Sequence, residues 1–397
     1  MSRRYNSGRP TSSHPSNTCR MENGKGAEVA SLLKVLPPVE FCCVYGSSLH
    51  PNNCDKSKMI DYILGVKDPM KWHSKNLKMN RDHYASLVLR LGGARLITDV
   101  ANDIGAGVHF NSYVSLGHKL FKYGVVRMND LIQDIMCWET FYLSGRLQKP
   151  VHILVDTLDV GNVNFVNLRA ATSAALLLLP SKFTEEDLYA RICGLSYMGD
   201  LRMLFAEDKN KVKKIVQGQF CSFQKMYKPV LTEYETRDLI RFSSGGDQEN
   251  IYQDCSLSSV RSLVASLPST IRNQMGLKLG ENRIRNQSGR TMFEVMINSR
   301  EEAAQCMQKV LRQKVMGSSV RQAVSGLLAV GCVNAARQVP GNGNEKKHQR
   351  LKFFITSTLV VQTMQLSWSC WDLRINFSLD LSFIFIFIVI FIFYFFV

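Results

Sequence analysis

Hydrophobic residues follow two different periods along the chain. Short apolar runs bounded by turn residues predict strands, whereas apolar positions that recur every three or four residues predict helices. The predicted strands are residues 39–45, 59–66, 108–114, 119–126 and 151–155. The predicted helices are residues 68–91, 129–143, 166–179, 184–197 and 210–227. Strands therefore dominate the first part of the chain and helices the part after residue 160, which predicts an α+β protein.

Capping residues support two of the predicted helix starts. Asp68 is a favourable N-cap and is followed by Pro69, which suits the first helical position. Thr184 with Asp187 three residues later forms a capping-box pattern, in which Asp replaces the more usual Glu. Both helices should therefore begin where the hydrophobic pattern starts them.

Composition divides the chain into six segments. In order these are residues 1–27, a disordered tail or organelle transit segment; 28–160, a first folded domain; 161–241, a helical domain; 242–259, a linker or loop; 260–339, a basic helical region; and 340–397, an atypical tail. The first segment is rich in Ser and Arg with little acid, which is typical of transit peptides, but Gly and Pro interrupt any amphipathic helix.

The tail ends in an uninterrupted run of mostly Phe and Ile, residues 383–397. This run is shorter than the roughly 18 to 20 residues that a membrane-spanning helix needs. Its monotony favours an artefact of the gene model, by read-through of non-coding sequence, over a membrane anchor.

Charge and cysteine usage restrict the partners and the compartment. The formal net charge of +16 indicates a polyanionic partner, and a nucleic acid, an anionic membrane or a nucleotide would each satisfy it. The 11 cysteines follow no disulfide framework and include no CxxC pair, which indicates reduced thiols in a cytosol-like or matrix-like compartment.

The most informative motif joins the first two predicted strands. Gly46 and Ser47 follow the first strand, and Asp61 lies within the second. A Gly-Ser pair at a strand end lets backbone N–H groups and a hydroxyl approach a triphosphate, and a neighbouring carboxylate can hold the Mg²⁺ that bridges the phosphates. The simpler interpretation is a tight turn and a solvated aspartate. Because an ionisable residue within an apolar strand needs a reason to be there, the functional interpretation is favoured.

The helix after Asp61 carries hydrogen-bonding residues at helical spacing. His73 and Asn76 belong to this stripe, which could read a base or a sugar. Lys122, on a later predicted strand, could meet a phosphate. A solvated helix face and a charged strand edge are the corresponding structural alternatives.

These motifs resemble two nested groups of proteins. The Gly-Ser and Asp spacing resembles the DNA-polymerase-beta-like nucleotidyltransferase superfamily. Longer segments resemble the mitochondrial phosphatidate cytidylyltransferase family, also called the translocator assembly and maintenance family, from about residue 39 to residue 339. The segments that carry this second resemblance are residues 45–47, 59–80, 122–126, 145–150 and 194–203.

The resemblance implies fold, reaction and location. It implies a polymerase-beta-like nucleotidyltransferase domain over residues 28–160 and a winged-helix-like helical domain over residues 161–241. It also implies CTP and phosphatidate as substrates, Mg²⁺ as cofactor, and cardiolipin biosynthesis as the pathway. The expected location is the matrix side of the mitochondrial inner membrane, with peripheral attachment to the anionic surface and no nucleic acid as partner.

One feature departs from the superfamily pattern. A second acid is expected two residues from the first, but Met59 and Ile63 occupy those positions. Asp61 is therefore predicted as the catalytic metal ligand, and Asp156 and Asp200 are the candidates for its partner. This departure keeps two alternatives open, a non-catalytic membrane-surface or import-assembly protein and a nucleic-acid nucleotidyltransferase. Few aromatic residues are interleaved with the basic ones, which disfavours the nucleic-acid alternative.

Overall fold

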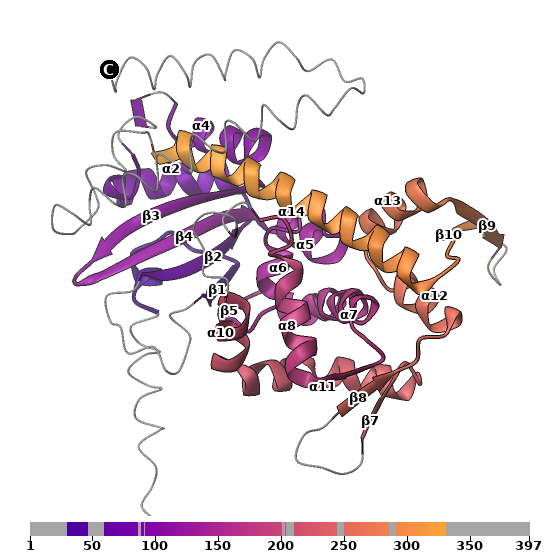
Figure 1. Cartoon of the computed structure of the whole chain (residues 1–397). Helices are drawn as coiled ribbons and strands as arrows, with labels where there is room; N and C mark the ends of the chain where they lie inside the picture. The colour runs from indigo at the N-terminus through magenta and orange to yellow at the C-terminus, as the bar shows by residue number, and fades with distance from the viewer. Residues whose placement is uncertain are drawn as a thin grey trace, which may run out of the picture.

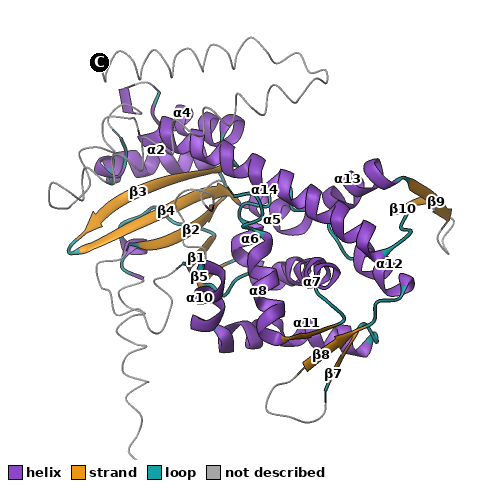
Figure 2. Ribbon diagram, in the orientation of Figure 1, coloured by secondary structure: helices purple, strands orange, loops and turns teal. Residues whose placement is uncertain are grey.

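The computed structural model describes residues 30–46, 59–85, 89–90, 92–200, 203, 210–243, 250–285 and 291–330. Within them the chain forms a mixed α/β structure (Figures 1 and 2). A five-stranded sheet with flanking helices comes first, and a largely helical part follows. The predicted α+β class is confirmed at this level.

The large sheet is mixed. Its strands, in spatial order, are β3 (Val108–Leu116), β4 (Lys119–Arg127), β2 (Ile60–Val66), β1 (Phe41–Tyr45) and β5 (His152–Asp156). β2 and β4 run parallel, and the other neighbours are antiparallel. The five predicted strands are thus all present.

Helical elements cover both faces of this sheet. One group comprises η1 (Leu32–Lys34), α2 (Pro69–Met79), η3 (Arg81–His83), α4 (Gly93–Asp99) and the π-helical turn η4 (Val100–Ile104). The other group comprises α5 (Met128–Cys137), α6 (Ser144–Leu147) and α7 (Val160–Leu178). Successive strand residues point to opposite faces. Tyr62 accordingly packs in one core with Trp72 of α2, whereas Ile63 packs in another with Leu131 of α5.

The helical part surrounds a separate core. Its further helices are α8 (Glu185–Leu195), α10 (Lys211–Gly218), α11 (Phe220–Thr236), α12 (Leu257–Ala265) and α13 (Ser269–Leu279). Its strands are β6 (Lys182–Thr184), β8 (Asn250–Gln253) and β7 (Ile240–Phe242), which form a three-stranded sheet in that order, and the separate hairpin of β9 (Glu281–Arg285) and β10 (Thr291–Val295). Large aromatic side chains such as Tyr189, Phe223 and Tyr227 fill this core.

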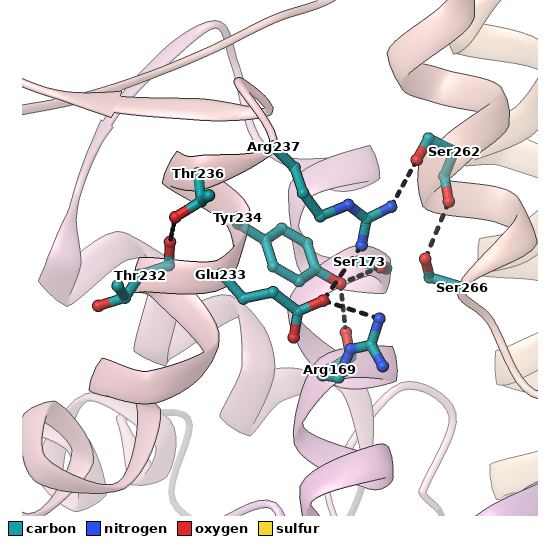
Figure 3. A network of polar contacts seen from close by, with 9 residues as sticks. All are labelled: Arg169, Ser173, Thr232, Glu233, Tyr234, Thr236, Arg237, Ser262 and Ser266. Carbon is teal, nitrogen blue, oxygen red and sulfur yellow. Dashed lines mark hydrogen bonds and ion pairs between the residues drawn. The ribbon is translucent and has the colours of Figure 1, made fainter.

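A polar network ties three helices of this part together (Figure 3). Glu233 of α11 accepts from Arg169 of α7 at 2.8 Å and from Arg237 at 3.3 Å. Arg237 also donates to the hydroxyl of Ser262 on α12 at 2.9 Å. The Tyr234 hydroxyl donates to the backbone oxygen of Arg169 at 2.9 Å. A carboxylate shared by two guanidinium groups fixes the relative positions of α7, α11 and α12.

The long helix α14 (Arg300–Val330) runs along both parts of the molecule (Figure 1). Arg300, at its start, donates to the backbone oxygen of Leu176 on α7 at 2.9 Å. Further along, Arg321 donates to the backbone oxygen of Ile104 at 3.2 Å, at the end of η4. The helix therefore links the helical part to the sheet. In the part of the chain that the structure describes, no helix is both long enough and apolar enough to cross a membrane.

Two predicted helices are shorter than expected. The helix predicted over residues 68–91 ends at Met79, because the Asn80 side chain donates to Val35 O and to Asn76 Oδ1, each at 2.8 Å, and its backbone leaves the helical region. The helix predicted over residues 129–143 ends at Cys137, since Trp138 adopts a left-handed conformation with φ of 52°. Neither ending has a local sequence signal as strong as a proline.

Both capping predictions are confirmed. The Asp68 carboxylate accepts from Lys71 N at 3.1 Å, with Pro69 at the first position of α2. Thr184 and Asp187 form the reciprocal capping box at the start of α8. Short-range hydrogen bonds of this kind depend only on neighbouring residues, which is why the sequence predicts them well.

Some predicted segments lie outside the described residues, and others contain elements that were not predicted. Residues 1–27 and 340–397 lie outside the described residues. Within the predicted linker 242–259, the structure places β8 and the first turn of α12. The predicted basic helical region 260–339 also contains the β9–β10 hairpin.

Candidate active site

Gly46 and Asp61 meet at the end of the β1–β2 ladder. Tyr45 and Asp61 are register partners, so the next residue, Gly46, lies beside the aspartate. The φ of Gly46 is +91°, a conformation that favours glycine. A Cβ atom there would lie 3.3 Å from Asp61 Oδ2. The missing side chain leaves the backbone open next to the carboxylate. Ser47 lies outside the described residues.

Lys122 pairs with Asp61 across the neighbouring strand. The two residues are register partners on the parallel strands β2 and β4. The Nζ of Lys122 lies 3.8 Å from Asp61 Oδ1, and the side chains are 30% and 25% exposed. Solvent therefore reaches the pair, and an incoming anion could compete for the lysine. The structure brings together these two residues that the sequence singled out.

Arg146 is the first residue of the site that the sequence reasoning did not single out. It lies on α6, with its guanidinium carbon 3.9 Å from the centre of the Tyr142 ring and 5.6 Å from that of Tyr45. The guanidinium also donates to Tyr142 O at 2.5 Å. Stacking on an aromatic ring restricts the planar group to few orientations. Arg146 is thus held beside the β1 end that carries Gly46.

Burial and three nearby cations shift the pKa of Asp61 in opposite directions. Burial raises the pKa of Asp61, and the charges of Lys122, Arg146 and Lys211, in that order, lower it only part of the way. The carboxylate consequently lies in a partly desolvated place that faces three cations from β4, α6 and α10. Desolvation of this kind strengthens the attraction of these cations for an anionic ligand.

Lys149 extends the positive charge toward the helical part. Its Nζ donates to Ser196 Oγ at 2.7 Å. The Nζ atoms of Lys149 and Lys211 lie 5.1 Å and 5.5 Å from the centre of the Tyr197 ring. We call Lys122, Arg146, Lys149 and Lys211 the cationic cluster. It joins the sheet to the helical part around Asp61.

The charge balance of this site indicates its ligand. Among the described residues, the charges of Lys122, Arg146 and Lys211 act on the Asp61 carboxylate, and Lys149 lies with Lys211 at the Tyr197 ring, so the site attracts a multiply charged anion. A nucleoside triphosphate fits, since its phosphates can meet the cations and an associated Mg²⁺ can meet Asp61. The glycine backbone at position 46 permits close approach.

His73 and Asn76 lie on the other face of the sheet. Tyr62 and Tyr123, the neighbours of Asp61 and Lys122 along their strands, pack on the α2 side. Asn76 is fully buried there and donates to the hydroxyls of Tyr84 and Tyr123, each at 2.8 Å. His73 is 1% exposed, and its Nδ1 lies 2.8 Å from the same Tyr84 hydroxyl. Burial and the nearby His109 lower its pKa. The structure does not bring these two side chains to Asp61, and it gives them partners inside the protein.

This placement leads to a prediction for Asn76→Ala. We expect loss of about 2–3 kcal/mol of unfolding free energy, because two tyrosine hydroxyls lose a buried partner. The KM for CTP, the nucleotide that the family resemblance implies, should stay within about twofold of the wild-type value. Thermal denaturation together with steady-state kinetics would check both effects. A large rise in KM at unchanged stability would instead support the predicted contact with the nucleotide.

Asp156 does not join Asp61. It is the register partner of Phe41, at the end of β1 opposite to Tyr45. Four residues of extended strand separate the two ends by about 13 Å. The Asp156 carboxylate accepts from the backbone N–H groups of Val160 and Gly161 at 2.7 Å and 2.9 Å, at the start of α7. In this structure Asp156 is therefore a helix-capping residue, not a partner of Asp61 for one metal ion.

Asp200 lies against α14. It is 3% exposed, and its Oδ1 accepts from Ser319 Oγ at 2.9 Å. Among the described residues, no group of three or more His, Cys, Asp or Glu side chains could hold a metal ion. Asp61 still suits one Mg²⁺, because magnesium in nucleotide sites uses one or two carboxylates together with phosphate oxygens and water.

Sheet alternation could have linked Asp61 to Lys122, since parallel strands of similar pattern bring equivalent positions together. Pattern and spacing give no comparable signal for Arg146, Lys149 or Lys211, although the first two lie in the segment 145–150 that carries the family resemblance. They come from separate helices or from a helix end, and only packing brings them to the sheet. Their residue types are common on any basic surface.

An α+β protein with a carboxylate near a cationic cluster at a strand end has the features expected of a protein that binds phosphate-bearing ligands. The family model described as mitochondrial phosphatidate cytidylyltransferase matches residues 29–340. The chain belongs to this family.

Individual relatives agree with the family match. The chain is 37% identical over 297 residues to the mitochondrial phosphatidate cytidylyltransferase of Homo sapiens, which covers 72% of this chain and 63% of the human protein. It is 36% identical over 296 residues to the Bos taurus protein of the same name, with 72% and 84% covered. The Caenorhabditis elegans protein of that name is 34% identical over 253 residues, with 62% and 76% covered. The match to the human protein thus spans less than two thirds of its length.

Proposed function

We propose that this chain transfers a cytidylyl group from CTP to phosphatidate, producing CDP-diacylglycerol and pyrophosphate. A phosphate oxygen of phosphatidate bonds to the α-phosphorus of CTP, and the bond from that phosphorus to the bridging oxygen of the β-phosphate breaks. The observation that carries the proposal is Asp61 within the cationic cluster, next to the open backbone of Gly46. Family membership supplies the identity of the two substrates.

The proposed architecture is a polymerase-beta-like nucleotidyltransferase domain followed by a winged-helix-like domain. The mixed sheet with Gly46 and Asp61 at a strand end supports the first part. The order α7, β6, α8, α10, α11, β7, β8 supports the second, because helix, strand, two or three helices and a hairpin is the order of a winged-helix unit.

The protein residues act mainly by position and charge. Lys122, Arg146, Lys149 and Lys211 bind the triphosphate and stabilise the negative charge that gathers on the leaving pyrophosphate. Gly46 lets the phosphates approach the backbone at the end of β1. The attacking phosphate monoester is already ionised near neutral pH, so the residues need not remove a proton from it.

Asp61 would hold the Mg²⁺ that accompanies CTP. When bound, the ion neutralises phosphate charge and polarises the phosphoryl group. The charge of Lys122 lowers the pKa of Asp61 and so opposes the rise that burial causes.

We further propose that the enzyme works in cardiolipin biosynthesis at the mitochondrial inner membrane. The relatives are named mitochondrial, and the product is the activated lipid that such a pathway consumes. Attachment would be peripheral, on the matrix side, through the basic surface of the region 260–339.

One experiment separates this proposal from its alternatives. The full chain is incubated with CTP labelled at the α-phosphate, Mg²⁺, and either phosphatidate vesicles or RNA. Label in a chloroform-soluble product only with phosphatidate is the expected result. Label in RNA would indicate a nucleic-acid nucleotidyltransferase. No transfer to either acceptor by a folded chain would favour the non-catalytic alternative.

Some basic residues of the region 260–339 make contacts within the protein. Lys314 donates to Glu139 O at 2.7 Å, and Arg321 donates to carbonyls of η4, so these two serve internal contacts. Apart from Arg321, which is also exposed, the exposed cations among the described residues of this region are Arg261, Lys278, Arg283, Lys309 and Arg312.

Vesicle binding should therefore depend strongly on salt. Each basic residue near an anionic surface contributes about 1 kcal/mol, and the attraction decays within a Debye length of roughly 10 Å at 0.1 M salt. We expect co-sedimentation with anionic vesicles to weaken steeply as salt rises, while CTP affinity changes much less.

Charge reversal provides the matched control. Lys278→Glu with Lys309→Glu should weaken vesicle binding, whereas Lys225→Glu, an equal change per residue at an exposed position of α11, should have little effect. Equal binding to neutral vesicles would show that apolar insertion or a protein partner holds the enzyme to the membrane.

A further inference from the structure

Asp134, near the end of α5, is a buried carboxylate that accepts six hydrogen bonds. It is 4% exposed. Its Oδ1 accepts from Thr140 N, Thr140 Oγ1 and Phe141 N at 2.7, 3.0 and 2.8 Å. Its Oδ2 accepts from Leu143 N, Ser144 N and Ser144 Oγ at 3.0, 2.9 and 3.0 Å. All six donors belong to the segment that follows the helix, so one side chain organises this whole turn.

The segment adopts a backbone that aromatic residues disfavour. Trp138 and Phe141 have φ of 52° and 57°, in the left-handed region. Such conformations persist only when the surroundings over-determine them. Here four N–H groups and two hydroxyls converge on one negative charge, which favours this backbone over alternatives that would disperse the donors.

The segment leads directly into the cationic cluster. Ser144, whose N–H and hydroxyl reach Asp134, is the first residue of α6. Arg146 lies on the same short helix, and Lys149 donates to Gly145 O at 2.5 Å. Tyr142, on which the Arg146 guanidinium stacks, lies between the residues that Asp134 holds. The positions of both cations therefore follow the shape of this turn.

Other elements hold the rest of the turn through hydrogen bonds that Asp134 does not make. Trp138 Nε1 donates to Asn167 Oδ1 on α7 at 2.8 Å. Thr270 of α13 donates to Cys137 O, and Lys314 of α14 donates to Glu139 O at 2.7 Å. Because these contacts remain when Asp134 is changed, a variant at this position should keep the overall fold and lose the local shape.

We infer that Asp134 is a positioning residue of the active site, which acts through the turn 138–144 to hold Arg146 and Lys149 where they bind the CTP triphosphate. This inference rests on the proposed function. It adds that the triphosphate side of the site is set in advance by a carboxylate at the end of α5, before any ligand binds. Such preorganisation lowers the cost of ordering the cations when the nucleotide arrives.

The test is CTP binding by Asp134→Asn, measured by calorimetry on the full chain with Mg²⁺ and no lipid. The amide keeps the size of the side chain but has one acceptor oxygen and presents an NH₂ group to donors. We expect CTP affinity to fall about tenfold or more, because a small displacement of a positioned group has effects of this size. In turnover assays the KM for CTP should rise, and the KM for phosphatidate should change little.

A second turn organised by an aspartate, this one exposed to solvent, provides the control. Asp254 accepts from Ser256 N, Ser256 Oγ and Ser259 Oγ at 3.0, 2.5 and 2.6 Å, just before α12. Figure 1 places α12 far from the large sheet. Asp254→Asn should therefore lower thermal stability without changing CTP affinity. This control separates loss of a turn in general from loss of the turn that carries Arg146.

A double-mutant cycle tests the route of the effect. In a chain with Arg146→Ala and Lys149→Ala, the further change Asp134→Asn should reduce CTP affinity by less than about twofold, since the residues through which it acts are gone. Its effect on thermal stability should be the same in both backgrounds. A full additional loss of CTP affinity would overturn the inference, and so would a stability loss with unchanged CTP affinity in the wild-type background.

Two milder variants cover the case in which Asp134→Asn does not fold. Thr140→Val and Ser144→Ala each remove one hydroxyl donor and leave the backbone donors in place. Both should weaken CTP binding in the same direction by a smaller factor, and unchanged affinity in both would overturn the inference. If the wild-type chain itself does not bind CTP, the proposed function fails first, which distinguishes the two failures.

Discussion

Asp61→Asn is expected to reduce Mg²⁺-dependent synthesis of CDP-diacylglycerol by on the order of 10³-fold, because the site would lose the carboxylate that we propose holds the metal ion. Asparagine has the same shape, so the fold should be unaffected. Thermal stability at pH 7 should equal or exceed that of the wild-type chain. Steady-state assays with labelled CTP and a thermal melt measure the two effects separately.

The stability part of this expectation follows from the pKa of Asp61. Burial raises this pKa above its ordinary value of 3.8, despite Lys122, Arg146 and Lys211. An acid with a higher pKa in the folded chain binds its proton more tightly there, so its ionisation at neutral pH opposes folding. The stability advantage of the variant should therefore be present above the folded-state pKa. It should shrink as the pH falls toward 3.8, where the side chain becomes protonated in both states.

Two outcomes would contradict this prediction. Turnover near the wild-type rate would remove Asp61 from the mechanism. A large loss of stability at pH 7, growing as pH rises, would mean that the ion pair with Lys122 dominates over burial, and that Asp61 is chiefly a structural residue. Lys122→Met removes the partner charge. If Asp61 holds the metal ion, this variant should mainly weaken CTP binding. If Asp61 is chiefly structural, it should mainly destabilise the fold.

Arg146→Ala is expected to weaken CTP binding by about 10- to 100-fold, the loss typical of one charged group that contacts phosphate in a partly desolvated site. The charge of Arg146 lowers the pKa of Asp61. Its guanidinium carbon lies 3.9 Å from the centre of the Tyr142 ring. Arg146→Lys should recover only part of the affinity, because an ammonium group cannot stack on the ring or bind phosphate in two places at once. Calorimetric titration with CTP and Mg²⁺ measures both variants.

A remote arginine serves as the control for Arg146. Arg241 pairs with Asp238 at 3.4 Å, and both side chains are more than three quarters exposed, at 77% and 79%. Arg241→Ala should leave CTP affinity unchanged and alter stability little, since exposed ion pairs contribute little. Unchanged CTP affinity in Arg146→Ala would show that the nucleotide binds elsewhere, and the positioning role inferred for Asp134 would fall with it.

Tertiary packing places several of the predicted site residues away from Asp61. His73 and Asn76 form a stripe at helical spacing, and that spacing is real, but it faces the core against Tyr84 and Tyr123. Periodicity shows which residues share a helix face and does not show what that face meets. Asp156 similarly follows a strand as predicted, yet it lies at the far end of β1 from Asp61 and caps α7.

The sequence by itself determined the local features of this protein. The five strands, the starts of α2 and α8, and the meeting of Gly46 with Asp61 all follow from residues close together in the chain or from one antiparallel ladder. Apolar period, N-caps and strand pairing are short-range interactions, so their signals survive in the sequence. Family membership also follows from the linear order of motifs.

Only the tertiary structure decided which charges surround Asp61. Arg146 is brought there because Leu147 of α6 packs in one core with the sheet, whereas Lys211 comes from α10, which packs in the core of the helical part. Lys149 and Lys211 both lie near the Tyr197 ring. Arg146 and Lys149 follow a turn whose donors converge on Asp134 and which α7, α13 and α14 also hold. A hydrogen bond between distant segments leaves no periodic signal in the sequence, because its geometry exists only after the helices have packed.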